Sequence, residues 1–498
     1  MNNLQSIQYF LPELLIAITS LFVILFDLVS LKKIKLSFTI FKREVSFNSS
    51  ELLIGSALVC ISILLYQMPL NGGHIFHGML INDSFSYYFK WLILISTGSI
   101  ILVSKYSNEL DKEYKTEFDA LILFVLLGMF LMTNSIDLLM IYLSIELVSI
   151  PSYILAGMKK NDKKSNEASL KYVIFGSFAS GLMLFGLSWL YGISGSTNIY
   201  EIYDSISLIE NPYMVYMSLM LILIGFGYKI SMAPLHYWTP DVYEGSPTIV
   251  TAFFSAAPKA AGFAILIRTF FILFTSSNAL NLDAVPLEGI DWFLIIAVLS
   301  AVTMTIGNLL ALKQDNVKRM LAYSTISHVG FMLMAFSTAS VDAVIGIMFY
   351  LTLYMFMNLS AFFMVIHVEN NFAATEIKQW GGLGYKTPIL AIFMVLSLVS
   401  LAGLPPTSGF VGKVYLFRTL FATEKFYWLG IIGILNSVIS LYYYFKIVKS
   451  MYFDESVIDA KEDKPLLLFL IIIFFSAQNL LFYTYWQTLY NYITSLFI

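Results

Sequence analysis

Five ionisable side chains in this sequence stand inside long apolar stretches. Glu146 lies in LLMIYLSIELVSIPSYIL, Lys229 in LILIGFGYKISMAPLHYW and Lys259 in VTAFFSAAPKAAGFAIL. His328 lies in LAYSTISHVGFML, and Lys413 lies in LAGLPPTSGFVGKVYLF. A buried lysine takes up or releases a proton as a carboxylate partner approaches or leaves, whereas an arginine stays charged. Histidine titrates near neutral pH. These residue types therefore predict a proton relay within the apolar part of the chain.

Each of these side chains also has a structural alternative. A glutamate such as Glu146 can form a buried ion pair that only fixes helix packing, and a lone lysine can extend its ammonium group to the membrane interface. We expect the second behaviour for Lys90, which stands near the outer end of a predicted span. For His328 the alternative is a hydrogen-bonded packing residue. His236, with two acidic residues soon after it, is predicted to belong to a solvated loop cluster, with proton uptake as the alternative.

The composition shows what kind of protein must position these residues. Of 498 residues, 58% are hydrophobic and 12% are charged, and the mean hydropathy is +0.78. Soluble domains carry about 25% charged residues, so the chain belongs in a bilayer. A single cysteine, Cys60, excludes a disulfide framework, a cysteine-ligated iron–sulfur cluster and a structural zinc site. No phosphate-binding motif is present, and a net charge of −3 gives no support for a nucleic-acid partner.

The hydropathy pattern predicts an all-α polytopic membrane protein, since about 20 apolar residues are needed for each helix to cross the hydrocarbon core. Fourteen spans are expected, near residues 8–30, 52–68, 85–105, 118–134, 136–157, 168–191, 213–233, 247–274, 291–311, 319–338, 342–366, 388–418, 427–451 and 465–490.

The positions of lysine and arginine give the predicted orientation. Most of the 29 basic residues fall in the loops after the first, third, fifth, ninth, eleventh and thirteenth spans. On the opposite side only Arg418 and Lys425 are found. Because cytoplasmic loops carry the excess of basic residues, both termini are expected outside.

Prolines inside two of the spans predict interrupted helices. Pro258 stands within the eighth span and Pro405 and Pro406 within the twelfth, so both of these spans are expected to be broken, and Pro234 directly follows the seventh span. Proline removes a backbone hydrogen bond, and irregular backbone at membrane depth is tolerated only where it is buried or lines a cavity. Matching broken helices in two halves point to an inverted repeat. The matching candidates are Pro234 after the seventh span and Pro405 and Pro406 in the twelfth. Five steps separate the seventh span from the twelfth, and an odd number inverts the topology, so we predict repeats over spans 4–8 and 9–13.

The longest motifs resemble a known family. The segments GYKISMAPLHYWTPDVYEGSPTIVTAFFSAAPKAAGFAILIRTF, ALKQDNVKRMLAYSTISHVGFM and SLAGLPPTSGFVGKVYLF are similar to the antiporter-like membrane subunits of respiratory complex I, and TPDVYEG-SP is most like the subunit N branch. Subunit M generally has glutamate where this chain has Lys413, which also favours the N branch. The resemblance covers essentially the whole chain.

The resemblance implies fourteen spans with both termini outside and a proton path along a mid-membrane axis. It implies that Glu146 and Lys229 are a conformationally sensitive pair, that Lys259 and His328 connect the relay, and that Lys413 is its terminal group. It further implies a bacterial inner-membrane complex, the NADH-quinone oxidoreductase, in which other subunits hold flavin, iron–sulfur clusters and the quinone site. No cofactor or metal is expected in this chain.

The expected organisation follows from both arguments. Residues 1–107 hold three N-terminal spans, 118–275 the first repeat, 291–451 the second repeat, and 464–498 the last span. Two functional alternatives remain open. One is a subunit of an Mrp-type sodium/proton antiporter or a membrane-bound hydrogenase, and the other is a structural spacer that transmits motion without carrying protons.

Overall fold

The computed structural model describes residues 3–28, 35–40, 43–70, 72–209, 212–275, 291–455 and 465–497, and these residues are nearly all helical. The α-helices are α1 Asn3–Tyr9, α2 Leu11–Leu28, α3 Ser49–Gln67, α4 Ser84–Ser104, α5 Lys115–Asn134, α6 Leu138–Ala156, α7 Lys163–Ser194, α8 Ile199–Ile206, α9 Tyr213–Ile230, α10 Trp238–Gly245, α11 Thr248–Leu273, α12 Trp292–Leu312, α13 Val317–Phe336, α14 Val341–Phe372, α15 Leu383–Lys386, α16 Pro388–Ala402, α17 Ser408–Ala422, α18 Tyr427–Phe453 and α19 Leu466–Ser495. Three 3-10 turns add η1 Phe76–Gly78, η2 Lys112–Tyr114 and η3 Ile377–Trp380.

Two small antiparallel hairpins interrupt the helical pattern within the described ranges. Strands β1 (Lys35–Ile40) and β2 (Arg43–Asn48) form the first, and β3 (Gly73–Ile75) and β4 (Leu80–Asn82) form the second. Both hairpins lie in connections between predicted spans. The hydropathy pattern did not predict them, because they are too short to bury an apolar face of their own.

Every predicted span coincides with a helix or a helix pair. In the described part of the chain, eleven helices are long and apolar enough to cross a membrane. The remaining predicted spans coincide with α2, with α13 and with the pair α16 and α17, which have shorter or more polar apolar stretches. The polytopic all-α architecture is thus confirmed, whereas the count of fourteen and the division into two repeats stay predictions.

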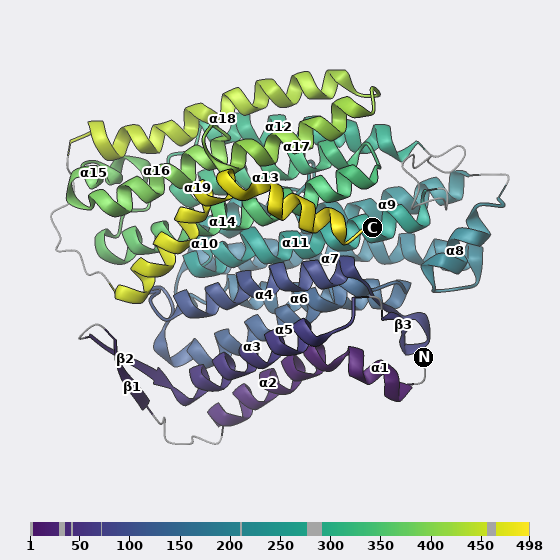
Figure 1. The fold of residues 1–498 in the computed structure, drawn as a ribbon, viewed down its shortest axis with the longest axis horizontal. Helices are drawn as coiled ribbons and strands as arrows, with labels where there is room; N and C mark the ends of the chain where they lie inside the picture. Colours follow the sequence, from purple (N-terminus) through teal and green to yellow (C-terminus); the bar gives the residue numbers. More distant parts are fainter. Residues whose placement is uncertain are drawn as a thin grey trace.

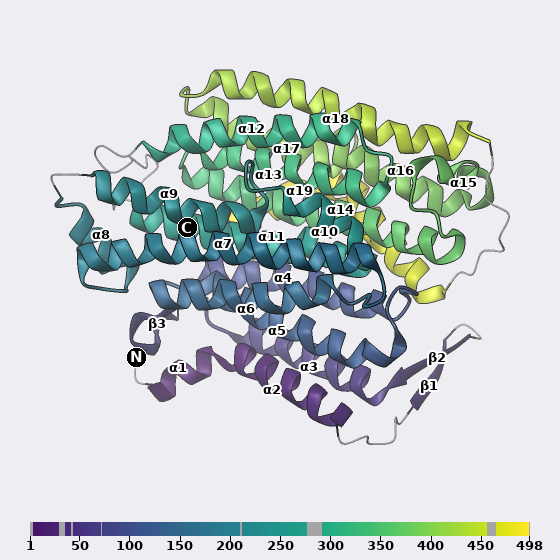
Figure 2. The same ribbon diagram turned by 180° about the vertical axis from the view of Figure 1, so that it is seen from behind.

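Helices α11 and α14 form the centre of the bundle. The long helices lie side by side, with α2 to α5 along one flank and α12, α17 and α18 along the other (Figures 1 and 2). The most apolar stretch of α11 and that of α14 are completely buried, as expected of helices that are hydrophobic on all sides. Helix α19 packs across α14, α16 and α17. A charged residue within these buried stretches of α11 or α14 is therefore enclosed by protein.

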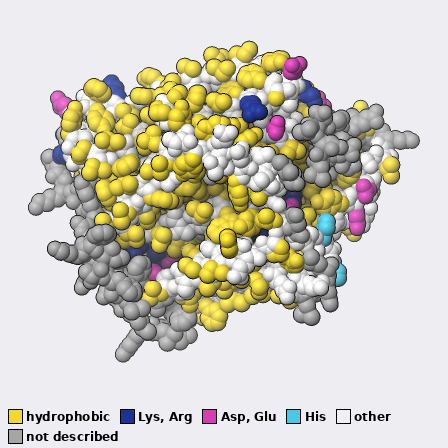
Figure 3. Space-filling view, in the orientation of Figure 1, with side chains coloured by type: hydrophobic (Ala, Val, Ile, Leu, Met, Phe, Trp, Pro, Cys, Tyr) yellow, Lys and Arg dark blue, Asp and Glu magenta, His cyan; other side chains and the backbone are white. Residues whose placement is uncertain are grey.

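The outer face of the bundle exposes hydrophobic side chains. Hydrophobic side chains cover most of the face seen in Figure 3, and exposed leucine, isoleucine and phenylalanine side chains recur along α7, α18 and α19. A surface of this kind suits lipid or neighbouring apolar helices. The two chain ends are both marked toward the end of the molecule that carries α8, away from β1 and β2 (Figures 1 and 2).

Two of the predicted spans are interrupted, as their prolines indicate. Helix α9 ends at Ile230 and α10 begins at Trp238, with Ser231 in the left-handed region at φ 66°. Helix α16 ends at Ala402 and α17 begins at Ser408, with Gly403 at φ 83°. The predicted break at Pro258 is wrong, because α11 continues through it. Proline removes a single backbone hydrogen bond there, and the helices that pack around the buried α11 retain its helical form.

Lys90 does not extend to the membrane interface, so that prediction is wrong. Its ammonium group lies 2.6 Å from Oε1 of Glu13, and both side chains are buried. Glu13 belongs to α2 and Lys90 to α4, and the hydropathy profile of each helix could not reveal that the two would meet. The carboxylate of Glu13 neutralises the charge of Lys90, so the ammonium group can be buried without water around it.

Candidate functional site

Lys229 stands at the end of α9, where the first interrupted helix breaks off. Its buried ammonium group donates a hydrogen bond to Oγ of Ser149 on α6, at 3.0 Å. Glu146 lies one turn earlier on α6, and its carboxylate interacts electrostatically with the Lys229 ammonium group. No hydrogen bond or ion pair joins the two among the described contacts, and Oε1 of Glu146 is buried without a hydrogen-bond partner. The predicted pair is therefore adjacent but not in contact.

Lys259 binds the broken end of the first interrupted helix. From the middle of α11 its ammonium group donates to the carbonyl oxygen of Ile230 at 2.8 Å and also to Oγ of Ser231. The same ammonium group lies 5.4 Å from the centre of the Trp238 ring, a cation–π distance. The last carbonyl groups of a helix have no partner within the helix and carry partial negative charge. The ammonium group of Lys259 donates a hydrogen bond to such a carbonyl group, and its positive charge balances the partial negative charge of the helix end.

His328 lies inside a cage of tyrosine side chains. Its Nδ1 is 2.6 Å from the hydroxyl of Tyr350 and its Nε2 is 3.1 Å from the hydroxyl of Tyr444. The ring of Tyr354 packs at 5.2 Å from the imidazole. Both ring nitrogens therefore face hydroxyl groups, which can donate or accept, so that the imidazole can change its protonation state without losing its partners.

Lys413 repeats the arrangement of Lys259 at the second interruption. Its buried ammonium group donates to the carbonyl oxygen of Ala402, the last residue of α16, at 2.8 Å, and to Oγ of Ser437 on α18 at 3.3 Å. It also lies 5.0 Å from the centre of the Phe331 ring, one turn from His328 on α13. A cavity beside it is lined by residues of α16, α17 and α18 and by the loop at Gly403.

The structure joins the five predicted residues in three pairs. Electrostatic interaction links Glu146 with Lys229, Lys229 with Lys259, and His328 with Lys413. Between Lys259 and His328 the described residues show no hydrogen bond. The relay through these five residues stays a prediction.

The three lysines share one chemical property. Every hydrogen bond that their ammonium groups make in the described part goes to a neutral oxygen atom, either a carbonyl or a hydroxyl. A lysine without a contacting carboxylate is not fixed in its charged form. Such a lysine can release or take up a proton when a nearby charge moves.

His236 does not belong to a solvated cluster. It lies in the interruption after α9, is buried, and stacks on Tyr237. The acidic residues that follow it, Asp241 and Glu244, instead form ion pairs with Lys164, Lys171 and Arg319 at the surface; the cluster therefore exists without the histidine.

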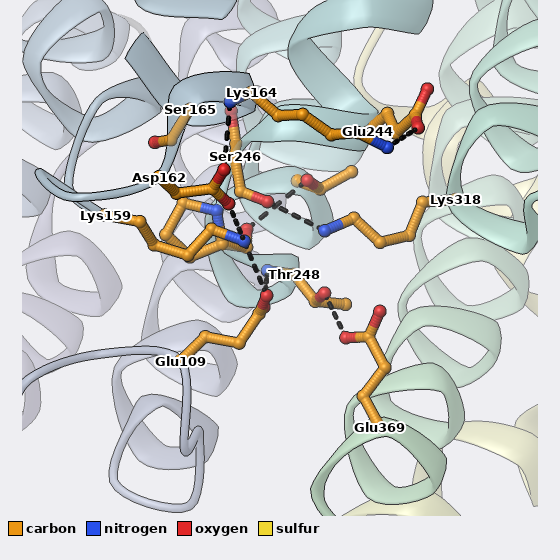
Figure 4. A network of polar contacts seen from close by, with 12 residues as sticks. Glu109, Lys159, Asp162, Lys164, Ser165, Glu244, Ser246, Thr248, Lys318 and Glu369 are labelled. Carbon is orange, nitrogen blue, oxygen red and sulfur yellow. Dashed lines mark hydrogen bonds and ion pairs between the residues drawn. The ribbon is translucent and has the colours of Figure 1, made fainter. Parts of the chain in front are cut away.

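Sequence reasoning missed a polar network around the first residues of α11 (Figure 4). Lys159 lies 2.9 Å from Oε1 of Glu109, whose other oxygen accepts from the backbone N–H of Thr248. The Thr248 hydroxyl donates to Glu369, and Lys318 donates to the carbonyl oxygen of Ser246 at 2.8 Å. These residues come from separate loops and helix ends, so their spacing in the chain carried no signal. Within the described ranges, no three His, Cys, Asp or Glu side chains gather closely enough to hold a metal ion.

Comparisons with known proteins show which family the chain resembles. Residues 135–440 match the family described as NADH:quinone oxidoreductase/Mrp antiporter, transmembrane. NADH-quinone oxidoreductase subunit N 2 of Sorangium cellulosum is 42% identical over 510 aligned positions, covering 99% of this chain and 97% of that protein.

Two solved structures extend the likeness to the fold. A chain of respiratory complex I from Thermus thermophilus superposes with a TM-score of 0.75 at 26% identity, covering 95% of this chain and 96% of that chain. A chain of the Mrp complex from Dietzia superposes with a TM-score of 0.77 at 20% identity, over 100% and 97% of the two chains. The second likeness concerns the fold alone.

Proposed function

The chain belongs to the NADH:quinone oxidoreductase/Mrp antiporter family of membrane subunits and is a relative of subunit N, and from this membership we propose that it translocates protons in the membrane arm of an NADH-quinone oxidoreductase. The observation that carries the proposal is the series of three buried lysines whose ammonium groups, among the described residues, donate hydrogen bonds only to neutral oxygen atoms. Glu146 interacts electrostatically with Lys229, the first of them, and a cavity lies beside Lys413, the last.

The proposed relay begins with Glu146 and Lys229. When Glu146 approaches, its negative charge stabilises the protonated form of Lys229, and when it moves away Lys229 holds its proton less strongly. The proton then passes to Lys259, which the carbonyl of Ile230 and the hydroxyl of Ser231 hold in place. A change of a few pKa units, each worth about 1.4 kcal/mol, is sufficient to drive each proton transfer.

His328 and Lys413 complete the relay. The tyrosine hydroxyls orient the imidazole, and the charge on Lys413 influences its protonation because the two groups interact electrostatically. Lys413 takes up the proton and releases it through the adjoining cavity.

The remaining parts of the proposal concern the assembly. Quinone reduction in other subunits would drive the movement of charge at Glu146, and those subunits would hold the flavin, the iron–sulfur clusters and the quinone site. This chain itself performs no redox step. It lies in the bacterial inner membrane as a multi-pass subunit with both termini outside, among other membrane and peripheral subunits of the complex.

A replacement of Lys229 by methionine in the assembled complex tests the relay. We expect NADH oxidation to become uncoupled from, or to slow together with, the proton translocation assigned to this subunit, because the side chain can no longer carry a proton. Lys446→Met is the control, since Lys446 forms a partly exposed ion pair with Asp315 outside the relay. Normal proton translocation and normal NADH oxidation in Lys229→Met would contradict the relay.

Three further outcomes bear on the role of this chain. If Glu146→Gln and Lys229→Met together leave translocation intact, the chain is a structural spacer. Comigration with a large NADH-oxidising band on a native gel supports the oxidoreductase assignment. Sodium-dependent proton exchange in vesicles without any NADH dehydrogenase would instead support the Mrp-type antiporter, whose fold this chain shares.

A further inference from the structure

A second group of buried polar atoms lies outside the relay, between α10, α13 and α14. Asn358 of α14 is fully buried, and neither its Oδ1 nor its Nδ2 makes a hydrogen bond in the described part. Tyr243 of α10 is also fully buried, and its hydroxyl has no hydrogen-bond partner there. An unpartnered buried amide or phenol is costly, and an ordered water molecule is the usual partner of such groups.

These two residues lie against one face of α14. Tyr354, Asn358 and Phe362 follow one another at four-residue intervals, so they share a face of that helix. The ring of Tyr243 packs 6.4 Å from that of Phe362, and its hydroxyl interacts electrostatically with Tyr354. Tyr243 therefore spans the stretch of α14 on which Asn358 stands.

The inner end of this group meets the tyrosine cage of His328. The hydroxyl of Tyr354 donates to Oγ1 of Thr325 on α13 at 3.0 Å, and its ring packs on the imidazole of His328. Water molecules beside Asn358 and Tyr243 would thus stand next to the hydroxyl groups that surround His328.

The outer end meets the network shown in Figure 4. Ser246 follows Tyr243 by three residues, and its hydroxyl is buried without a hydrogen-bond partner in the described part. Glu369, farther along α14 than Asn358, accepts from Thr248 through one oxygen, while its other oxygen is buried and unpartnered. Unpartnered polar atoms therefore recur from the charged end of α14 to its centre.

The charges at this end distinguish Glu369, which has a buried unpartnered oxygen, from Glu109. Burial alone would raise the pKa of Glu109, but the ammonium groups of Lys318 and Lys159 lower it to about 2. Glu109 consequently stays ionised. Glu369 makes no ion pair among the described residues, although the charges of Lys318, Glu109 and Lys159 all act on it.

We propose that water molecules enter between α10, α13 and α14 beside Glu369 and form a proton inlet that leads past Tyr243 and Asn358 to the tyrosine cage of His328. This inlet supplies the second half of the relay without passing through Lys229 or Lys259. The delivery of protons to the relay rests on the proposed function, whereas the binding of water at Asn358 does not depend on that function.

The first test is the water itself. An experimental density map of the assembled complex at a resolution that reveals water should show molecules bonded to the Asn358 amide and to the Tyr243 hydroxyl. In addition, Asn358→Leu should lower the melting temperature of the complex, because the hydrogen bonds to water are lost. An increase in melting temperature, or a site without water density, would overturn the inlet, since a dry amide is improved by an apolar side chain of similar volume.

The second test is proton translocation by the assembled complex. Asn358→Leu and Tyr243→Phe should reduce the number of protons translocated for each NADH oxidised, and Asn358→Ser should recover part of the loss because a hydroxyl can still bind water. Asn479→Leu is the matched control, since Asn479 is an equally buried and unpartnered amide on α19, which is not one of the three helices that line the proposed inlet. It should translocate normally.

The outcomes separate the inlet from the relay. If Lys229→Met abolishes translocation while Asn358→Leu and Tyr243→Phe leave it unchanged, the inlet is wrong and the relay stands. If Lys229→Met has no effect, the relay is wrong, and the density at Asn358 alone decides whether water enters. Should Asn358→Leu fail to assemble, Tyr243→Phe and Asn358→Ser provide the same measurement.

Discussion

The ammonium group of Lys259 lies 2.8 Å from the carbonyl oxygen of Ile230, the last residue of the first interrupted helix. An equal distance joins Lys413 to Ala402, the last residue before the second interruption. In each case a positive side chain meets the end of a helix where unpaired carbonyl groups concentrate negative partial charge. The two lysines reach this position from different places, since Lys259 comes from a neighbouring helix and Lys413 from the helix after the break.

The hydrogen bond from Lys413 to the Ala402 carbonyl predicts that one substitution can keep the positive charge while it prevents the release of a proton. Lys413→Arg should retain a donor for the Ala402 carbonyl, and the complex should assemble and melt normally, but an arginine does not release its proton and translocation should fail. Lys413→Met should lose translocation and also about 1–3 kcal/mol of stability, because the buried carbonyl is left unpartnered. Melting curves and proton counts on the two variants check this. Normal pumping by Lys413→Arg would contradict a titrating role.

The buried pair of Glu13 and Lys90 predicts strong coupling between α2 and α4. Either Glu13→Leu or Lys90→Met alone should cost about 3–5 kcal/mol, because one charge remains buried without its partner. The double variant Glu13→Leu with Lys90→Met should be close to neutral. Denaturation of the purified complex measures both. As a control, Asp315→Asn breaks a largely exposed pair with Lys446 and should cost about 1 kcal/mol or less. Additive single effects would show that the two charges do not interact.

Glu109 predicts a pH dependence of stability at acid pH. Burial favours its protonated form, but Lys318 and Lys159 outweigh burial and lower the pKa from 4.5 to about 2. Because the pKa is lower in the folded state, the stabilisation is complete above pH 4.5 and is lost as the pH falls towards 2. It amounts to at most about 3 kcal/mol. Glu109→Gln should therefore be less stable than the native chain at neutral pH, and the two should converge near pH 2. A constant difference across this range would contradict the assignment.

The second interruption predicts an intolerance of side chains at Gly409. A Cβ atom there would overlap the carbonyl oxygen of Ser400, whose hydroxyl accepts from the Gly409 N–H at 3.1 Å. Gly409→Ala should therefore force α16 and α17 apart, at a cost of about 1–3 kcal/mol or more. The amount of assembled complex and its melting temperature check this. Gly181→Ala on α7 is the control, because a Cβ there meets open space and alanine favours the helix by up to about 1 kcal/mol. Equal melting temperatures for the two variants would contradict the close approach.

Local sequence properties determined much of the architecture. The length of each apolar stretch predicted the helices, because crossing a hydrocarbon layer requires a minimum length. Pro405 and Pro406 predicted the interruption after Ala402, since proline cannot continue the hydrogen-bond ladder. The rarity of charge in such stretches also identified Glu146, Lys229, Lys259 and Lys413 as the residues to examine. The three lysines are buried and Glu146 is partly buried, which agrees with that choice, while their roles stay predictions.

Only the tertiary structure decided which partner each charged group meets. Lys90 was expected at the interface and instead pairs with Glu13, and Glu146 and Lys229 are adjacent without an ion pair. The network of Glu109, Lys318 and Glu369 draws on segments far apart in the chain. Hydropathy sets how deep a residue lies, because transfer from water depends on the side chain and its neighbours in sequence. The partner is set by the rotation and packing of whole helices, which depend on long-range contacts that no local pattern encodes.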